Sequence, residues 1–126
     1  VENMKKLEAE TAGNTKMTLC IALSYGARHE IVNAARKIAM LAKRGDILPE
    51  DVDIKMFSDM LYTKDMPDPD LVIRTSGEQR ISNYLLWQIA YAEFFFTDVL
   101  WPDFNKKLLE DIIKNFNMRE RRYGKA

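Results

Sequence analysis

The apolar run MTLCIALSY, residues 17–25, restricts the possible folds of this chain more than any other segment. It has the length of a β-strand, and apolar side chains occupy it almost without interruption. Runs of this kind are typical of a parallel strand that is covered on both faces. We therefore expect residues 17–25 to form a strand of a layered α/β structure, with neighbouring strands at its edges.

Helical and strand patterns alternate along the rest of the chain. Two helices are expected in the first part of the chain, one ending near Gly13 and one over 28–44 that stops at Gly45. Three more are expected: one beginning at Pro49, one over 82–93 capped by Ser82, and one capped by Asp103 or Asn105. Further strands are expected over 71–75 and 94–99. This alternation predicts an α/β fold, a parallel sheet with flanking helices. About three strands make a thin sheet, so we expect an incomplete portion of a larger one.

Composition narrows the class of protein. The 126 residues fit one domain, and the 19 Lys and Arg balance the 19 Asp and Glu, so binding of nucleic acid through bulk charge is not expected. Cys20 is the single cysteine, which excludes an intrachain disulfide, and its place in the apolar run predicts a packed, reduced thiol. No apolar stretch reaches the length of a membrane span. A cytoplasmic protein is the simplest interpretation.

A polar loop between two apolar segments is the candidate functional site. Arg74 ends the predicted strand 71–75, and Arg80 and Ser82 come just before the predicted helix. In open parallel sheets, ligands bind outside the carboxyl ends of the strands. A helix N-terminus favours anions, and guanidinium groups match pairs of phosphate oxygens. The pattern therefore suits a phosphate or diphosphate.

A structural role for the same arginines is the alternative. Arg74 and Arg80 could instead pair with Glu78 and Asp70 and so hold the loop together. The spacing alone favours neither interpretation, because short loop motifs are weak signals.

The segment PDLVIRTSGEQRISNYLLWQIAYAEFFFTDVLWPDF, residues 69–104, carries a long and specific motif. It is similar to the C-terminal signature of the cis-prenyltransferases, the family that includes undecaprenyl diphosphate synthase. The similarity extends upstream through TAGNTKMTLCIALSYGARHEIV and downstream to RERRYG. Nearly the whole chain is covered.

The resemblance implies a reaction and its substrates. Members of this family condense isopentenyl diphosphate with an allylic diphosphate, and the product is a cis-polyprenyl diphosphate such as the undecaprenyl carrier of cell-wall synthesis. By this resemblance, Arg74, Arg80, Ile81 and Ser82 form the isopentenyl diphosphate site. The lipid product also implies possible peripheral contact with the inner face of the membrane.

The resemblance further implies a metal ligand and a homodimer. Glu93 matches a Mg²⁺ ligand, and Arg122 and Gly124 match the terminal R-x-G, which reaches into the partner subunit's site. A straight helix over 83–93 would put Glu93 ~16 Å along its axis from Ser82. Either the helix breaks early, or Glu93 serves another site, such as one across the dimer interface. Spacing alone favours a solvated carboxylate at a helix end.

One motif of the family is absent from the chain. The family's D-G-N-G-R-W, in its N-terminal half, has no counterpart here. The resemblance thus implies that residues 1–126 are the C-terminal part of a single domain, without a catalytic residue of their own and inactive alone. A non-catalytic partner subunit of a heteromeric enzyme is the alternative, although such chains usually lose the pattern that Arg74, Glu78, Arg80 and Ser82 keep.

Overall fold

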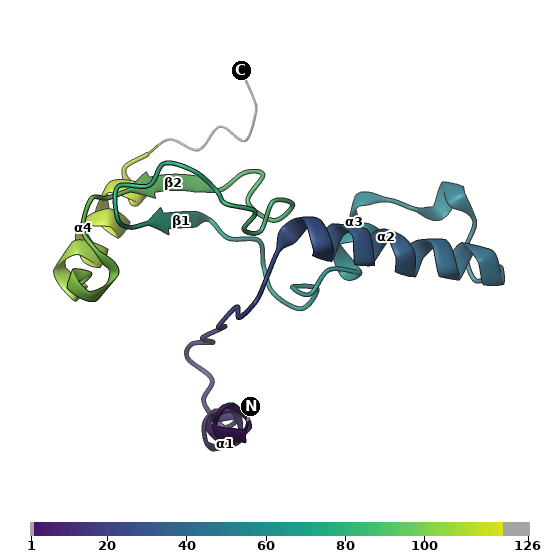
Figure 1. Ribbon diagram of the computed structural model, residues 1–126, viewed down its shortest axis with the longest axis horizontal. Coiled ribbons are helices and arrows are strands. Elements are labelled where there is room, and N and C mark those ends of the chain that lie inside the picture. The colour runs from purple at the N-terminus through teal and green to yellow at the C-terminus, as the bar shows by residue number, and fades with distance from the viewer. Residues whose placement is uncertain (1, 120–126) are drawn as a thin grey trace.

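The computed structural model describes residues 2–119, in which helices and two short strands alternate (Figure 1). In chain order the elements are α1 (Glu2–Thr11), α2 (Ala27–Arg44), the 3₁₀ turn η1 (Pro49–Asp51), α3 (Ile54–Asp59), β1 (Leu71–Arg74), β2 (Glu93–Phe96), the 3₁₀ turn η2 (Trp101–Asp103) and α4 (Lys106–Asn117). Within this range no helix combines the length and the apolar character that crossing a bilayer requires.

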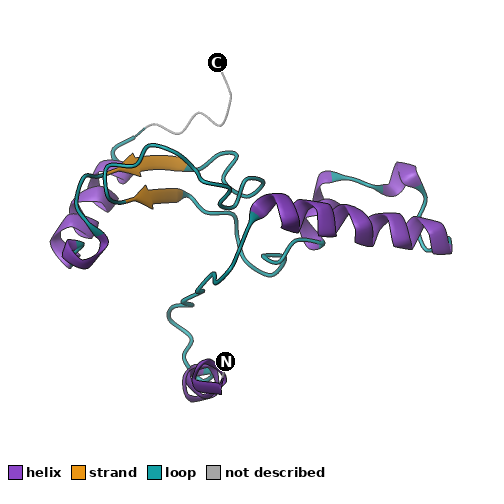
Figure 2. Ribbon diagram, viewed as in Figure 1, coloured by secondary structure: helices purple, strands orange, loops and turns teal. Residues whose placement is uncertain are grey.

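The strands pair in parallel, which confirms the predicted α/β class. Leu71 lies opposite Glu93 and Arg74 opposite Phe96, in a sheet of two strands. Figure 2 shows α4 at one end of this sheet and the pair α2 and α3 at the other, whereas α1 stands apart from all of them. Helix α2 ends as predicted, at Gly45, whose left-handed φ of 77° lets its N–H bond back to the last turn.

The strand expected at residues 17–25 does not form. Residues 17–24 are exposed, and within the described residues no hydrogen bond joins them to another part of the chain. The chain bends at Leu23 and Ser24, where Ser24 has a φ of 52°. Cys20 is exposed as well, so the prediction of a packed thiol is wrong. A strand exists only through its partners, and the two strands that the structure describes pair with each other. The sheet therefore has two strands here instead of about three.

The prediction of a helix over 82–93 is also wrong. Ser82, Asn83 and Leu85 have φ angles of 50°, 62° and 46°, and a right-handed helix requires negative φ. The reason lies in a distant contact. The Asn83 carbonyl accepts from the Ala27 N–H, and its Oδ1 accepts from the Arg28 N–H, both at 2.9 Å. Asn83 thus caps α2, and the chain forms turns until β2 begins.

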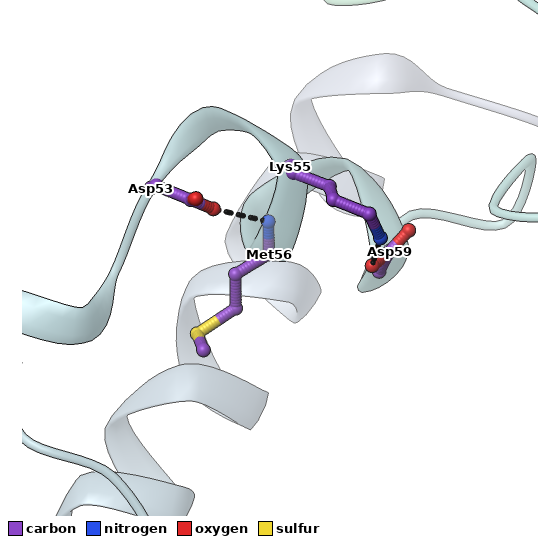
Figure 3. Close-up of polar contacts among 4 residues, drawn as sticks. All are labelled: Asp53, Lys55, Met56 and Asp59. Carbon is purple, nitrogen blue, oxygen red and sulfur yellow. Dashed lines mark hydrogen bonds and ion pairs between the residues drawn. The ribbon is translucent and has the colours of Figure 1, made fainter.

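Side-chain caps determine where the shorter helices begin. The helix predicted from Pro49 is divided into η1 and α3, because the Asp53 side chain accepts from the Met56 N–H at 2.7 Å and starts α3 anew. Figure 3 shows this cap and the ion pair of Lys55 with Asp59, one turn apart at 2.6 Å. Of the two caps proposed for the last helix, Asn105 is confirmed, and it accepts from the Leu108 N–H at 3.1 Å.

The buried apolar core is small. It consists of Ala27, Ala34, Leu61, Ile89 and Ile112. The sequence predicts a buried stripe on α4, but of that stripe only Ile112 is fully buried, at 1% exposure, whereas Leu109 and Ile113 are exposed. Helix α4 therefore buries one narrow side, on which Leu108 and Phe116 are half-buried.

Truncating Ile112 should destabilise the chain far more than truncating its neighbour. We expect Ile112→Ala to lower the free energy of unfolding by about 2–5 kcal/mol, because it removes a buried side chain and leaves a cavity. Ile113→Ala is the matched control; since Ile113 is 43% exposed, we expect a loss below about 1 kcal/mol. Urea unfolding followed by circular dichroism measures both. Equal losses would contradict the packing described for α4.

Candidate functional site

The loop that follows Arg74 is held at the carboxyl edge of the sheet. The Thr97 N–H donates to the Arg74 carbonyl at 2.9 Å, and the N–H groups of Ser76 and Gly77 donate to the carbonyls of Val99 and Thr97, also at 2.9 Å. Gly77 has a φ of 70°, and a Cβ there would lie 3.0 Å from Asp98 Oδ1, so glycine suits this turn. The two strand exits thus hold the loop in place.

All four residues predicted for the diphosphate site line one cavity. The cavity has a volume of about 280 Å³, and Arg74, Arg80, Ile81 and Ser82 form one part of its lining. We call it the arginine cavity. The Arg74 guanidinium donates to the Ser82 hydroxyl at 3.1 Å and to the Arg80 carbonyl oxygen. Side chains of β1, β2 and the turn 84–89 form the remaining, largely apolar wall.

The two arginines differ in their partners. Arg80 forms an ion pair with Glu78, as the structural alternative predicts, and both side chains are exposed enough for water to weaken the pair. Within residues 2–119 Arg74 forms no ion pair with a carboxylate; its partners are neutral oxygens. Arg74 is therefore a half-buried cation beside a cavity, and no acidic group of residues 2–119 forms an ion pair with it.

Glu93 lies away from the arginine cavity. It begins β2 opposite Leu71, whereas Arg74 ends β1, so the two lie about three residues apart along the sheet, ~10 Å. The Glu93 carboxylate accepts from Arg119 Nη1 at 2.8 Å. The helix over 83–93, from which the ~16 Å between Ser82 and Glu93 was expected, does not form. Glu93 is nevertheless separated from Arg74 by the length of the strand.

The described residues do not by themselves fit a Mg²⁺ site. Mg²⁺ prefers several oxygen ligands in octahedral arrangement. Among residues 2–119 no group of three or more Asp, Glu, His or Cys side chains lies close enough together to hold a metal ion. Glu93 offers one carboxylate, which is already paired with Arg119. Its predicted role as a metal ligand stays a prediction, and Arg122 and Gly124 lie outside the described residues.

A buried polar network beside the start of α2 escaped the sequence analysis. Glu30 is 1% exposed; its Oε1 accepts from the Tyr62 N–H at 2.7 Å, and its Oε2 accepts from the Tyr25 hydroxyl and from Gln88 Nε2. Desolvation, and then the hydrogen bond to Glu30, raise the pKa of the Tyr25 phenol well above its usual value. The signal in the sequence was a glutamate on the buried side of an amphipathic helix.

The Tyr25 pKa predicts loss of stability at alkaline pH. Unfolded tyrosine releases its proton near pH 10, while folded Tyr25 retains it. The unfolded state then binds fewer protons, so the free energy of unfolding falls as pH rises above about 10. Ultraviolet titration of phenolate should reveal one late-titrating tyrosine that Tyr25→Phe removes. If this variant leaves the titration curve unchanged, the network is not formed as described.

Comparison with known proteins identifies the family. The family model described as "Putative undecaprenyl diphosphate synthase" matches residues 1–124. The chain is 51% identical over 125 residues to an isoprenyl transferase of Porphyromonas gingivalis, covering 99% of this chain and 49% of the relative. It is 50% identical over 123 residues to the ditrans,polycis-undecaprenyl-diphosphate synthase ((2E,6E)-farnesyl-diphosphate specific) of Escherichia coli strain K12, covering 98% and 49%.

Solved structures agree with the family. Lavandulyl diphosphate synthase from Lavandula x intermedia, solved in complex with dimethylallyl diphosphate, superposes with a TM-score of 0.92 at 39% identity, covering 98% of this chain and 53% of that one. A probable undecaprenyl diphosphate synthase from Campylobacter jejuni gives 0.80 at 33% identity, covering 98% and 55%.

These similarities define an α/β protein of the prenyl diphosphate synthase class. The chain belongs to the undecaprenyl diphosphate synthase family of prenyltransferases, as its sequence motifs predicted. It spans about half the length of the curated relatives it matches.

Proposed function

We propose that this chain supplies the isopentenyl diphosphate site of a cis-prenyltransferase, which condenses isopentenyl diphosphate with an allylic diphosphate to form a cis-polyprenyl diphosphate of the undecaprenyl kind. The observation that carries the proposal is Arg74, a half-buried cation without a carboxylate partner in residues 2–119, beside Arg80 and Ser82 in one cavity. The name of the Escherichia coli relative supports the same reaction class.

The lining of the arginine cavity suits an isoprenyl diphosphate better than free phosphate. One part of the lining offers two guanidinium groups and a hydroxyl, and the other offers the apolar side chains of Ile89, Phe94 and Phe96. Guanidinium forks hold diphosphate oxygens by charge-assisted hydrogen bonds, and the apolar wall shelters a short hydrocarbon. Ile81 also lines the cavity and adds an apolar side chain between Arg80 and Ser82 in the sequence. These residues bind and orient the substrate.

The Glu78 carboxylate is the group that a diphosphate displaces from Arg80. An exposed ion pair contributes roughly 0–1 kcal/mol to stability. A phosphate that accepts two hydrogen bonds from one guanidinium binds more strongly than that. A non-catalytic partner subunit, the alternative, has no need for this arrangement. Arg74 requires no displacement of a carboxylate, so it receives the anion first.

The remainder of the proposal concerns the assembled enzyme. Residues 1–126 are the C-terminal part of one domain, and the remaining part supplies the D-G-N-G-R-W motif. Glu93 contributes one ligand to Mg²⁺ held mainly by groups outside the described residues, and Arg122 and Gly124 reach the partner's site in a homodimer. The enzyme works in the cytoplasm, with peripheral membrane contact through its lipid product.

Removing the Arg74 charge should weaken substrate binding. Hydrogen bonds to charged groups contribute about 1.5–3 kcal/mol, so we expect Arg74→Gln to raise the Kd for isopentenyl diphosphate by about 10- to 100-fold. Isothermal titration calorimetry measures it. Arg36→Gln, an exposed arginine on α2, is the matched control and should leave the Kd unchanged.

Two results would contradict this proposal. The first is an equal effect of Arg74→Gln and Arg36→Gln. The second is equal affinity for isopentenyl diphosphate and inorganic diphosphate, because the apolar wall should favour the former.

The chain alone should not elongate prenyl chains. With isopentenyl diphosphate, an allylic diphosphate and Mg²⁺, we expect no incorporation of labelled isopentenyl units into lipid, because residues 2–119 hold no group of side chains that could bind the metal ion. The full-length Escherichia coli relative is the positive control under identical conditions. Clear turnover by the 126-residue chain would show that its own residues suffice.

A further inference from the structure

The segment that leads from the arginine loop to β2 has an unusual backbone. Ser82, Asn83 and Leu85 have φ angles of 50°, 62° and 46°. Residues other than glycine rarely adopt positive φ, and they keep it where surrounding contacts enforce it. Of the three, only asparagine is a residue type that visits this conformation readily. A contact from outside the segment must therefore hold it.

Asn83 makes that contact with the start of α2. Gly26 precedes the helix without a side-chain cap, and its carbonyl accepts from the third and fourth N–H groups of α2. The first two N–H groups, those of Ala27 and Arg28, donate to the Asn83 carbonyl and to its Oδ1, both at 2.9 Å. Ala27 is fully buried, so water cannot replace this acceptor. We call this pair of bonds the Asn83 contact.

Gly26 leaves the space in which the Asn83 contact forms. Its φ of −155° is open to any residue, so the backbone does not require glycine here. A Cβ at Gly26 would, however, lie only 3.0 Å from Asn83 Nδ2. One position further along each segment, the rings of Tyr25 and Tyr84 meet edge to face, with centroids 5.7 Å apart. The two segments therefore fit each other closely.

The Asn83 contact lies directly beside the arginine cavity. Asn83 is not among the residues that line the cavity, but both of its neighbours are. Ser82 Oγ accepts from Arg74 at 3.1 Å, and Tyr84 forms part of the wall. Local preference opposes this arrangement, because residues 82–93 have the pattern of a helix with Ser82 as cap. A capping serine directs its oxygen at the N–H groups of its own helix, which would take it from Arg74.

We propose that Asn83 is a positioning residue of the isopentenyl diphosphate site. By binding the start of α2, it keeps the segment out of a helix and holds the Ser82 hydroxyl beside Arg74. This inference deepens the proposed function and rests on it. Asn83 acts through Ser82 and does not touch the substrate. It sets the fraction of molecules in which the site is ready for the anion, and apparent affinity falls with that fraction.

Substitutions of the Asn83 amide test this role. Asn83→Gly keeps the positive φ but loses Oδ1 and frees the backbone. We therefore expect the Kd of the 126-residue chain for isopentenyl diphosphate, measured by isothermal titration calorimetry, to rise about three- to thirtyfold. Asn83→Asp keeps an acceptor and should remain within about twofold of the wild type. Asn105→Ala, which removes the cap of α4, is the matched control and should leave the Kd unchanged.

A double-mutant cycle separates positioning from a general loss of stability. In a Ser82→Ala background, Asn83→Gly should raise the Kd by less than about twofold further, because the residue through which Asn83 acts is already absent. The full effect in this background would overturn the proposal. An equal rise in Kd from Asn105→Ala would do the same, as would failure of Asn83→Asp to restore binding.

The free chain gives a readout that requires no ligand. Asn83→Gly should shift the NMR signals of the Arg80 amide and the Arg74 guanidinium, neither of which adjoins Asn83 in the sequence. Unchanged signals would overturn the inference even where Arg74→Gln weakens binding. An unchanged Kd for Arg74→Gln would instead contradict the proposed function, and the spectra would then still decide whether Asn83 holds the loop.

Discussion

The parallel pairing of β1 with β2 is the interaction on which the candidate site depends. Its register puts Arg74 beside Phe96, at the edge where both strands leave the sheet. The exits are joined again by the backbone bonds from Ser76 and Gly77 to Val99 and Thr97. A cationic loop is thereby held against aromatic side chains. The same register carries Glu93 to the opposite end, which separates the carboxylate from the arginines.

The partners of the two arginines explain why the loop is suited to an anion. Arg74 donates to a peptide oxygen and a hydroxyl, which orient the guanidinium, and it forms no ion pair with a carboxylate in the part of the chain that the structure describes. Arg80 is paired with Glu78 near the surface, where water and salt weaken the attraction. A diphosphate would complete the coordination of the first and compete for the second. The structural alternative thus holds for Arg80, and Arg74 is the residue that separates the two interpretations.

Two neighbouring regions of the chain differ sharply in how they are packed. The buried Glu30 carboxylate accepts hydrogen bonds from Tyr25, Tyr62 and Gln88, as is usual for a buried polar group in a protein interior. A few residues earlier, the run 17–24 is apolar and bare. Close to this run, Gln88 Oε1 is buried and has no hydrogen-bond partner among the described residues.

The sequence by itself determined the features that depend on near neighbours. It predicted α2 with its stop at Gly45, the strand β1 and the family, and it narrowed the cap of the last helix to Asp103 or Asn105. It also placed Arg74, Arg80 and Ser82 close together, since one short loop joins them, and they do line one cavity. Tertiary structure decided the rest. Asn83 bonds to Arg28, 55 positions away, and that contact turns an apparent helix into a series of turns. Glu93 finds Arg119, 26 positions away. Residues 17–25 have every local mark of a strand and form none here, because a strand is made by hydrogen bonds to a neighbour, and a sequence pattern specifies the strand without supplying its partner.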